Sequence, residues 1–300
     1  MKGLTNFITE SNWKEIVICW YVFVDDAYRT VQKQGGGRRR RRGPEPEVSD
    51  SEIITLSLIL ETWFQGHEEV GYAFIQQFMT DLFPQTLDLD RFNVRRRQLI
   101  MSMENIRKVI KKQLIDPQDT FRLVDSAPIT LMTYTRGNRC ESVVGPEYFG
   151  VVTSKKSKIY GLRLHATITA GQVIDDWILA PASIHDTNAL DALLEDRKGL
   201  QVCGDKAYND QELEERLWLK RQILLMPLRR NNMSNRWPKG VQRLLGKARH
   251  LIETVFSTLS TTFNIQRPRG RTLTGHVTRI TTCILAHTLC FAVNSSLENP

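Results

Sequence analysis

The stretch that indicates the fold most directly is residues 201–208, Gln-Val-Cys-Gly-Asp-Lys-Ala-Tyr, a short apolar run that stops at Asp205. Short apolar runs bounded by glycine are typical of buried strands. Residues 121–125, Phe-Arg-Leu-Val-Asp, end in the same way at Asp125. Because strand ends can converge at one side of a sheet, the sequence predicts that these two aspartates act together.

The elements around these two stretches alternate between strands and helices. Two longer strands are expected at 159–169 and 173–179, joined through Ala170-Gly171 as a hairpin. The patterns that follow predict a helix at 186–196, a strand at 201–203, a helix at 210–220, a strand at 223–226, and helices at 239–262 and 273–292. This order predicts an α/β fold with a mixed sheet flanked by helices. We expect the last helix to cover the sheet rather than to pair protomers.

The first 118 residues have helical patterns instead. Ser49 and Glu52 have the spacing of a capping box, which starts a helix that runs to Gly66. Further helices are expected at 68–82 and from Asp88 to about 114. Residues 34–48 are a Gly/Arg-rich linker, expected to be disordered, whose Arg38–Arg42 run either clamps DNA or is only solvated. The sequence thus predicts an N-terminal helical domain at 1–118 and a second domain at 119–300.

Charge favours a polyanionic partner. The 300-residue chain has a net charge of +8, and its last 70 residues hold nine Lys and Arg against two Glu. Such a surface binds nucleic acid through released counterions, with an acidic membrane as the second choice. The longest unbroken apolar run, Ile16–Val24, is about half of what crosses a bilayer, so no membrane span is expected. Five cysteines without a Cys-x-x-Cys pair suggest neither disulfides nor zinc, and they favour a cytoplasmic location.

A third carboxylate, Glu253, lies within the helix expected at 239–262. It falls on the edge of the apolar stripe of that helix, with Arg249 one turn earlier on the same flank. Phosphodiester chemistry needs charge neutralised on the attacking and leaving oxygens, which two divalent ions roughly 3.5–4 Å apart achieve. Such hard ions prefer carboxylate oxygens. Each acidic residue alone is better explained as a cap or an ion-pair partner; the set indicates the chemistry.

The chain resembles the DDE-class insertion-sequence transposases, and it is most similar to insertion-sequence family 982. The matching segments are Val124–Ser126, Tyr160–His165, His185–Thr187, Gly204–Asp210, Pro227–Arg230 and Arg249–Phe256, with Ser49–Leu60 and Leu89–Arg97 in the front half. Together they cover about residues 48–292. Their order and spacing make the resemblance specific.

The resemblance implies a ribonuclease-H-like catalytic domain in which Asp125, Asp205 and Glu253 bind two Mg²⁺ or Mn²⁺ ions. It implies a DNA transposase that cuts at the ends of its element and transfers the 3′-hydroxyl into target DNA. The N-terminal helices would recognise the terminal inverted repeats, and synapsis of two ends implies a homodimer on DNA in a nucleoid-associated location. The wider group has Tyr, Arg, Glu and Lys on the last catalytic helix. Here Arg249 and Glu253 match, but Gly246 and Ser260 replace the other two.

Basic residues near these carboxylates are candidates for DNA contact. The candidates are Arg163, His165, Lys206, Arg229, Arg230 and Arg249. Arg163 and His165 alternate with apolar residues, so they belong to the polar face of a strand that either holds phosphate or is simply exposed. Trp237, among the later arginines, is more commonly a loop anchor than a stacking platform for a base. Asp186 or Thr187 is expected to cap the helix that follows.

Two other functions remain open from the sequence. One is a ribonuclease-H-like nuclease that cuts without strand transfer. The other is an inactive, transposase-derived DNA-binding protein, since a fold can outlive its function.

Overall fold

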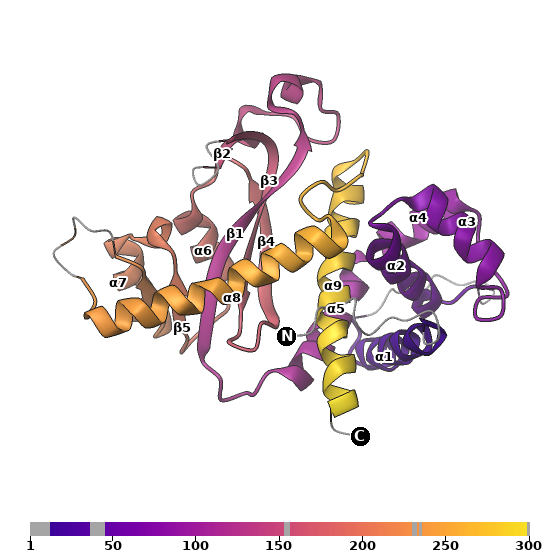
Figure 1. Cartoon of the computed structure of the whole chain (residues 1–300), viewed down its shortest axis with the longest axis horizontal. Helices are drawn as coiled ribbons and strands as arrows, with labels where there is room; N and C mark the ends of the chain where they lie inside the picture. Colours follow the sequence, from indigo (N-terminus) through magenta and orange to yellow (C-terminus); the bar gives the residue numbers. More distant parts are fainter. Residues whose placement is uncertain (1–12, 37–45, 153–156, 230–232, 234–235, 299–300) are drawn as a thin grey trace. The chain divides into compact units, whose positions relative to one another are not determined.

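A computed structural model describes residues 13–36, 46–152, 157–229, 233 and 236–298. The chain divides into two compact units (Figure 1). Unit 1 comprises Met1–Leu114 together with Thr262–Pro300, and unit 2 comprises Ile115–Thr261. The domain boundary predicted from the sequence, after residue 118, lies close to the end of the first segment of unit 1 at Leu114. The prediction assigned the C-terminal segment to the second domain, whereas the structure groups Thr262–Pro300 with the N-terminal helices.

Unit 1 is helical. Its helices are α1 (Trp13–Lys33), α2 (Asp50–Phe64), α3 (Glu68–Phe78), α4 (Leu89–Gln98), α5 (Ile100–Leu114) and α9 (Leu273–Glu298). The capping box at the start of α2 forms as predicted, because the Ser49 hydroxyl accepts from the Glu52 N–H at 3.1 Å and the Glu52 carboxylate accepts from the Ser49 N–H at 2.6 Å. The single helix expected from Asp88 to 114 is divided in two at Leu99.

Helix α9 packs against α5 and α2 within unit 1. Within the described residues it is also the one helix long and apolar enough to cross a membrane, at Leu273–Ser295, yet 83% of that window is buried inside the protein. The buried window explains its composition: a helix surrounded by other helices is apolar on most sides. Its threonines and histidines interrupt the apolar runs, which is why no long run marks it in the sequence.

Unit 2 is built on a six-stranded mixed sheet. Its strands are β1 (Phe121–Met132), β2 (Phe149–Val152), β3 (Ser157–Ile168), β4 (Ile174–Pro181), β5 (Gln201–Gly204) and β6 (Leu224–Pro227). The order is β2-β3-β1-β5-β6, with β4 also paired to β3. Strand β1 is antiparallel to β3 and parallel to β5, and β5 is parallel to β6. Strand β1 was predicted to end at Asp125, but its pairing with β3 carries it to Met132. Strand β2 was not predicted; it is four residues long and contains Gly150, whose Cβ would lie 2.6 Å from the Ala182 carbonyl oxygen.

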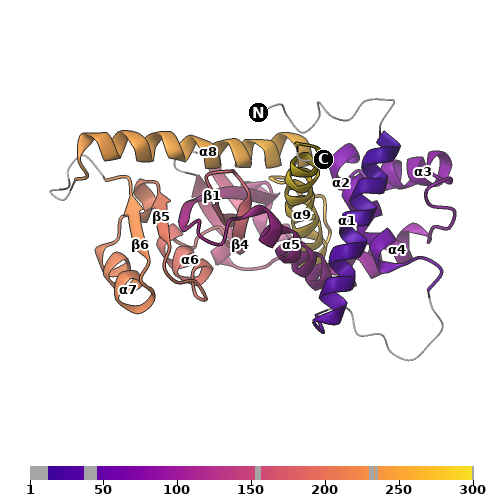
Figure 2. The same cartoon turned by 90° about the horizontal axis from the view of Figure 1, so that it is seen from below.

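Helices flank both faces of this sheet, as predicted. Figure 2 shows α8 (Lys239–Phe263) along one face and α6 (Asp186–Leu193) with α7 (Gln211–Arg221) on the other. The core under α6 and α7 joins Val124 and Val202 of the sheet to Leu190 and Leu217 of the helices. The α/β class and the mixed sheet are therefore confirmed.

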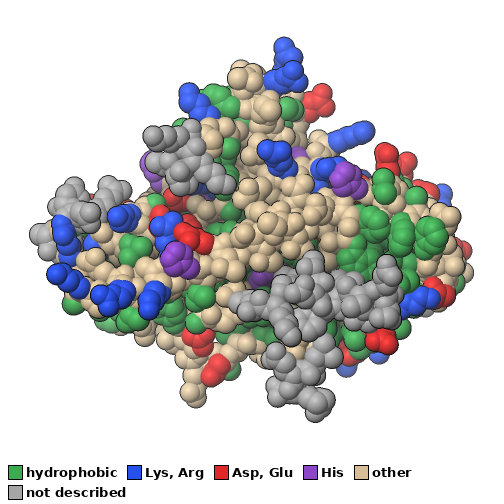
Figure 3. Space-filling view, in the orientation of Figure 1, with side chains coloured by type: hydrophobic (Ala, Val, Ile, Leu, Met, Phe, Trp, Pro, Cys, Tyr) green, Lys and Arg blue, Asp and Glu red, His purple; other side chains and the backbone are tan. Residues whose placement is uncertain are grey.

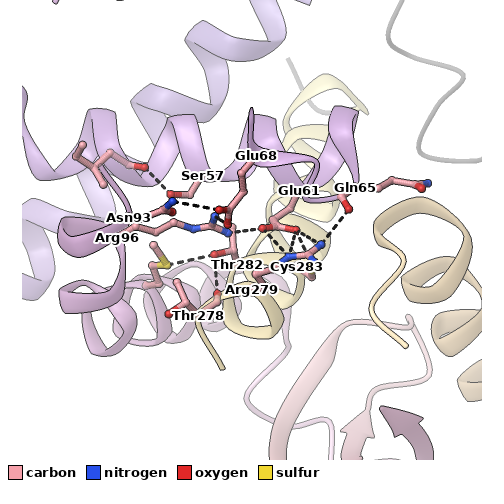
Figure 4. A network of polar contacts seen from close by, with 12 residues as sticks. Ser57, Glu61, Gln65, Glu68, Asn93, Arg96, Thr278, Arg279, Thr282 and Cys283 are labelled. Atoms are coloured by element: carbon pink, nitrogen blue, oxygen red, sulfur yellow. Dashed lines mark hydrogen bonds and ion pairs between the residues drawn. The ribbon is translucent and has the colours of Figure 1, made fainter. Parts of the chain in front are cut away.

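A buried ion-pair network ties the helices of unit 1 together. Glu61 of α2 is fully buried, and it accepts hydrogen bonds from Arg96 of α4 and from Arg279 of α9, whose Nη2 lies 2.8 Å from Glu61 Oε2 (Figure 4). Arg96 also contacts Glu68 of α3 at 3.1 Å. Burial alone would raise the pKa of Glu61, but the two arginines hold that pKa below its ordinary value. The carboxylate is therefore ionised and shared by three helices.

The network makes a stability prediction. Glu61→Ala leaves two buried guanidinium groups without their shared carboxylate, so the free energy of unfolding should fall by about 3–5 kcal/mol. Urea denaturation of the full chain followed by far-UV circular dichroism measures it. Glu15→Ala, at an exposed position of α1, is the control and should change stability by less than about 0.5 kcal/mol. Equal effects of the two substitutions would contradict this role of Glu61.

Candidate active site

Asp125 and Asp205 belong to neighbouring parallel strands: Asp205 directly follows β5, whereas Asp125 lies within β1, which the sequence predicted to end there and which continues to Met132. Strands β1 and β5 pair in parallel with Leu123 opposite Cys203, and each aspartate stands two residues beyond that pair. Asp125 Oδ1 accepts a hydrogen bond from the Ser126 N–H at 2.8 Å. Asp205 Oδ1 accepts one from the Ala207 N–H at 2.7 Å and caps a short helical turn. Local backbone geometry thus orients both carboxylates.

Asp125 lies in a buried, acidic environment. Its pKa is raised to about 7, mainly by burial and also by the nearby carboxylates of Asp205 and Asp186, while the Ser126 N–H and Arg249 oppose the shift. Several carboxylates with one guanidinium among them favour an added cation. This is the electrostatic pattern expected of a divalent metal site.

Glu253 lies on α8, and its side chain is 43% exposed. One carboxylate oxygen pairs with Arg249 Nε at 3.1 Å, and the other lies 3.0 Å from His250 Nδ1. Arg249 and Glu253 therefore share one flank of the helix, as the apolar stripe predicted. In the described part of the chain, which includes Asp125, Asp205 and Glu253, no three His, Cys, Asp or Glu side chains are placed to hold one metal ion. The structure thus places Asp125 and Asp205 on adjacent strands, and it pairs Glu253 with residues of its own helix.

Asp186 is a site residue that the sequence reasoning did not select. It was expected to cap α6, but the cap position is His185, which makes no side-chain capping bond. Asp186 Oδ1 instead accepts from the Ser126 hydroxyl at 2.8 Å and lies 3.5 Å from Arg163 Nη1. The signal was present in the His185-Asp186-Thr187 segment, which only the family resemblance singled out. Asp186 is thus joined through Ser126 to the backbone beside Asp125.

His165 is not on an open polar face. It is only 1% exposed, because α6 covers the side of the sheet to which it belongs. Burial lowers the pKa of His165 to about 4, with the neighbouring Arg163 adding to this effect and Asp186 opposing it. The ring is therefore neutral near pH 7. Arg163 is half-buried and donates to Ser126 at 3.2 Å and to the Val151 carbonyl at 2.7 Å.

The remaining candidates for DNA contact differ in how exposed their side chains are. Lys206 is exposed directly after Asp205. Arg229 is buried, donates two hydrogen bonds of 2.6 Å to Glu214, and stacks on Trp237 at 5.1 Å. Trp237 Nε1 donates to the Pro227 carbonyl at 2.9 Å, so this pair anchors a loop. Arg230 and the Arg38–Arg42 run lie outside the described residues.

Basic side chains also line the visible edge of the molecule over α8, next to a pair of acidic side chains (Figure 3). The basic residues of the first half of this helix are Lys239, Arg243, Lys247 and Arg249. A positive helix face beside a carboxylate site is suited to a substrate that carries phosphate.

Comparison with known proteins gives one match. A family model described as a transposase DDE domain matches residues 116–273, more than half of the chain. The matched range contains Asp125, Asp205 and Glu253. No curated protein and no solved structure matches the chain.

The raised pKa of Asp125 predicts how stability depends on pH. In the folded protein this pKa is about 7, against an ordinary value of 3.8. Between these values the unfolded chain releases the proton first, so the folded state loses stability as pH rises, by up to about 1.4 kcal/mol per unit. Asparagine removes this loss. In EDTA, the Tm of Asp125→Asn should exceed that of the wild type most clearly above pH 7, and the difference should shrink towards pH 4.

Thermal unfolding at several pH values measures this difference. Asp191→Asn is the control, because Asp191 pairs with Arg216 and Arg221 at 3.0 Å in the same unit. A difference between Asp125→Asn and wild type that stays constant from pH 4 to pH 8 would contradict the burial of this carboxylate.

Proposed function

This chain belongs to the transposase DDE domain family, and on that premise we propose that it is a DNA transposase that cuts at the ends of its element and joins the freed 3′-hydroxyl to target DNA. The observation that carries the proposal is the placement of Asp125 and Asp205 at matching positions of adjacent parallel strands, two residues beyond the Leu123–Cys203 pair and within the matched range. Such a pair suits phosphodiester chemistry, and burial beside other carboxylates raises the pKa of Asp125.

The two aspartates fit a hard divalent ion, Mg²⁺ or Mn²⁺. Their oxygens are the preferred ligands of such ions, and a cation would offset the burial and the carboxylate repulsion that raise the pKa of Asp125. When bound, two ions would neutralise charge on the attacking and leaving oxygens of the phosphodiester. Glu253 would complete the ligand set; to do so it must leave Arg249 and His250, with which it pairs here.

Residues of the chain itself hold the substrate and the ligands. Arg249, whose charge already acts on Asp125, becomes available to a phosphate once Glu253 turns away. Lys206 contacts the DNA backbone beside Asp205, because it is exposed and follows that ligand directly. Arg163 and His165 lie 3.5 and 3.6 Å from Asp186 Oδ1 and position that carboxylate, Arg229 is held by Glu214, and we keep Arg230 as a candidate DNA contact.

The proposal includes the partners of the reaction. DNA is the substrate twice, as the terminal inverted repeats of the element and as the target. Bringing two ends together requires at least a homodimer on DNA. We place the protein in the cytoplasm, associated with the nucleoid, and assign recognition of the repeats to the helices of unit 1.

Metal binding can be measured without activity. At pH 8, Mg²⁺ or Mn²⁺ should raise the Tm of the wild type by several degrees, because an ion held at a hundred times its Kd stabilises the folded state by about 2.7 kcal/mol. Asp125→Asn and Asp205→Asn should lose this shift, whereas Asp191→Asn should keep it. A shift that survives in both aspartate variants would place the metal elsewhere.

Strand transfer tests the function itself. The assay combines the purified full chain, the labelled DNA that flanks its own coding region, a supercoiled target and Mg²⁺ or Mn²⁺. Joined products should form with the wild type and with Asp191→Asn. They should fall at least about a hundredfold in Asp125→Asn, Asp205→Asn and Glu253→Gln, because each removes a ligand of the ions that would neutralise charge at the reacting phosphate.

Each other result of this assay has a meaning. Cutting without joining would indicate the nuclease. Specific DNA binding with neither reaction, unchanged in the three variants, would indicate the inactive DNA-binding protein. Loss in the aspartate variants alone would remove Glu253 from the ligand set.

A further inference from the structure

A cleft of about 1100 Å³ lies within unit 1, apart from the carboxylates of unit 2. Its walls come from the start of α3, from α4, and from the turn that leads into α9. Its floor includes Arg96 and Arg279 of the Glu61 network (Figure 4). The cleft is therefore fixed by buried ion pairs between the helices that form it.

Three helix N-termini line the cleft. They are the first residues of α3 (Glu68 and Glu69), of α4 (Leu89 and Asp90) and of α9 (Thr274 and Gly275). These helices have 11, 10 and 26 residues, so each has the positive end of its dipole here, with Asp88 capping α4 and Thr272 accepting from the Gly275 N–H of α9. A convergence of helix N-termini favours an anion, and phosphate is the commonest biological one.

Arginine side chains add full positive charge. Arg97 of α4 and Arg269 and Arg271 of the turn are exposed and line the cleft. Arg269 Nη1 lies 2.8 Å from His67 Nδ1, which links the two walls. Among the described residues, neither Arg97 nor Arg271 has a hydrogen-bond or ion-pair partner within the chain. Two cations on opposite walls are thus available to a ligand.

Acidic residues of the cleft do not cancel this charge. Glu68 already pairs with Arg96, and Glu69 and Asp90 lie in the first turns of their own helices, where they and the helix dipoles offset each other, so the remaining positive charge of the cleft comes from its arginines. In the floor, Arg279 is only 3% exposed, and its Nη1 has no hydrogen-bond partner among the described residues. The described residues thus hold more positive charge here than the carboxylates balance.

We propose that this cleft binds the phosphate backbone of duplex DNA, with Arg97 and Arg271 each contacting a phosphate. The inference rests on the proposed function, which makes DNA the substrate. Cations spread over two walls suit consecutive phosphates of a duplex better than a single small anion. Contacts to phosphate carry no sequence information, so the cleft positions DNA and leaves sequence recognition to other residues.

Salt-dependent binding tests this inference. The full chain carrying Asp125→Asn binds a fluorescent duplex in EDTA, where cutting does not interfere, and anisotropy is measured over a series of salt concentrations. Arg97→Gln and Arg271→Gln should each lower the slope of log K against log salt by about 1, and the double variant by about 2. The loss should be the same for the element end and for an unrelated duplex.

Arg267→Gln is the matched control. Arg267 is an exposed arginine on the same turn, but it does not line the cleft. An unchanged slope in the double variant, or an equal loss in the control, would overturn the inference. A third result would indicate a small-anion site instead: inorganic phosphate at millimolar concentration binds the wild type, while the arginine variants bind the duplex as tightly as the wild type does.

The cleavage and strand-transfer assay with the wild-type Asp125 separates this inference from the proposed function. Joining by the wild type with unchanged slopes in the arginine variants refutes the cleft alone. Lower slopes without any cutting or joining by the wild type refute the transposase and leave the cleft as a DNA site.

Discussion

The parallel pairing of β1 with β5 is the constraint on which the candidate site depends. It places Asp125 and Asp205 two residues beyond the Leu123–Cys203 pair, and burial, with the nearby carboxylates, raises the pKa of Asp125 to about 7. A buried carboxylate beside others costs the folded protein stability at neutral pH. Under the proposed function a divalent ion would offset this cost, because it would replace the water that burial removed. The surrounding hydrogen bonds from Ser126 and Ala207 fix the carboxylates in advance.

Unit 1 is built from both ends of the chain, whereas unit 2 is one continuous segment. The family match at 116–273 and the continuous segment of unit 2 nearly coincide, so the chemistry belongs to one uninterrupted part of the chain. Unit 1 combines the N-terminal helices with the returning helix α9, and the Glu61 network joins them. The same network forms the floor of the basic cleft, which couples the stability of unit 1 to its proposed contact with DNA.

The sequence was sufficient for the features that depend on neighbouring residues. The apolar run before Asp205 located the end of β5, and the Ser49 and Glu52 pair located the start of α2. The run before Asp125 located β1 but not its end, because the strand continues to Met132 through Pro128 and several polar residues.

The sequence was insufficient for features that depend on contacts between segments far apart in the chain. The alternation of polar and apolar residues showed that β3 has one polar and one apolar face. It could not show that α6 packs over the polar face and buries His165. Nor could it show that Asp186 turns to Ser126, or that Glu253 pairs with Arg249 and His250, because each depends on side-chain direction after folding.

The central claim is that Asp125 and Asp205 together form a divalent metal site. A crystal of the full chain grown with Mn²⁺ and measured at a wavelength where manganese scatters anomalously tests this claim most directly. The account predicts an anomalous peak within coordination distance of both aspartates, with Glu253 released from Arg249. Ordered Mn²⁺ that contacts neither aspartate, or crystals of the same quality with no peak between them at saturating Mn²⁺, would contradict it.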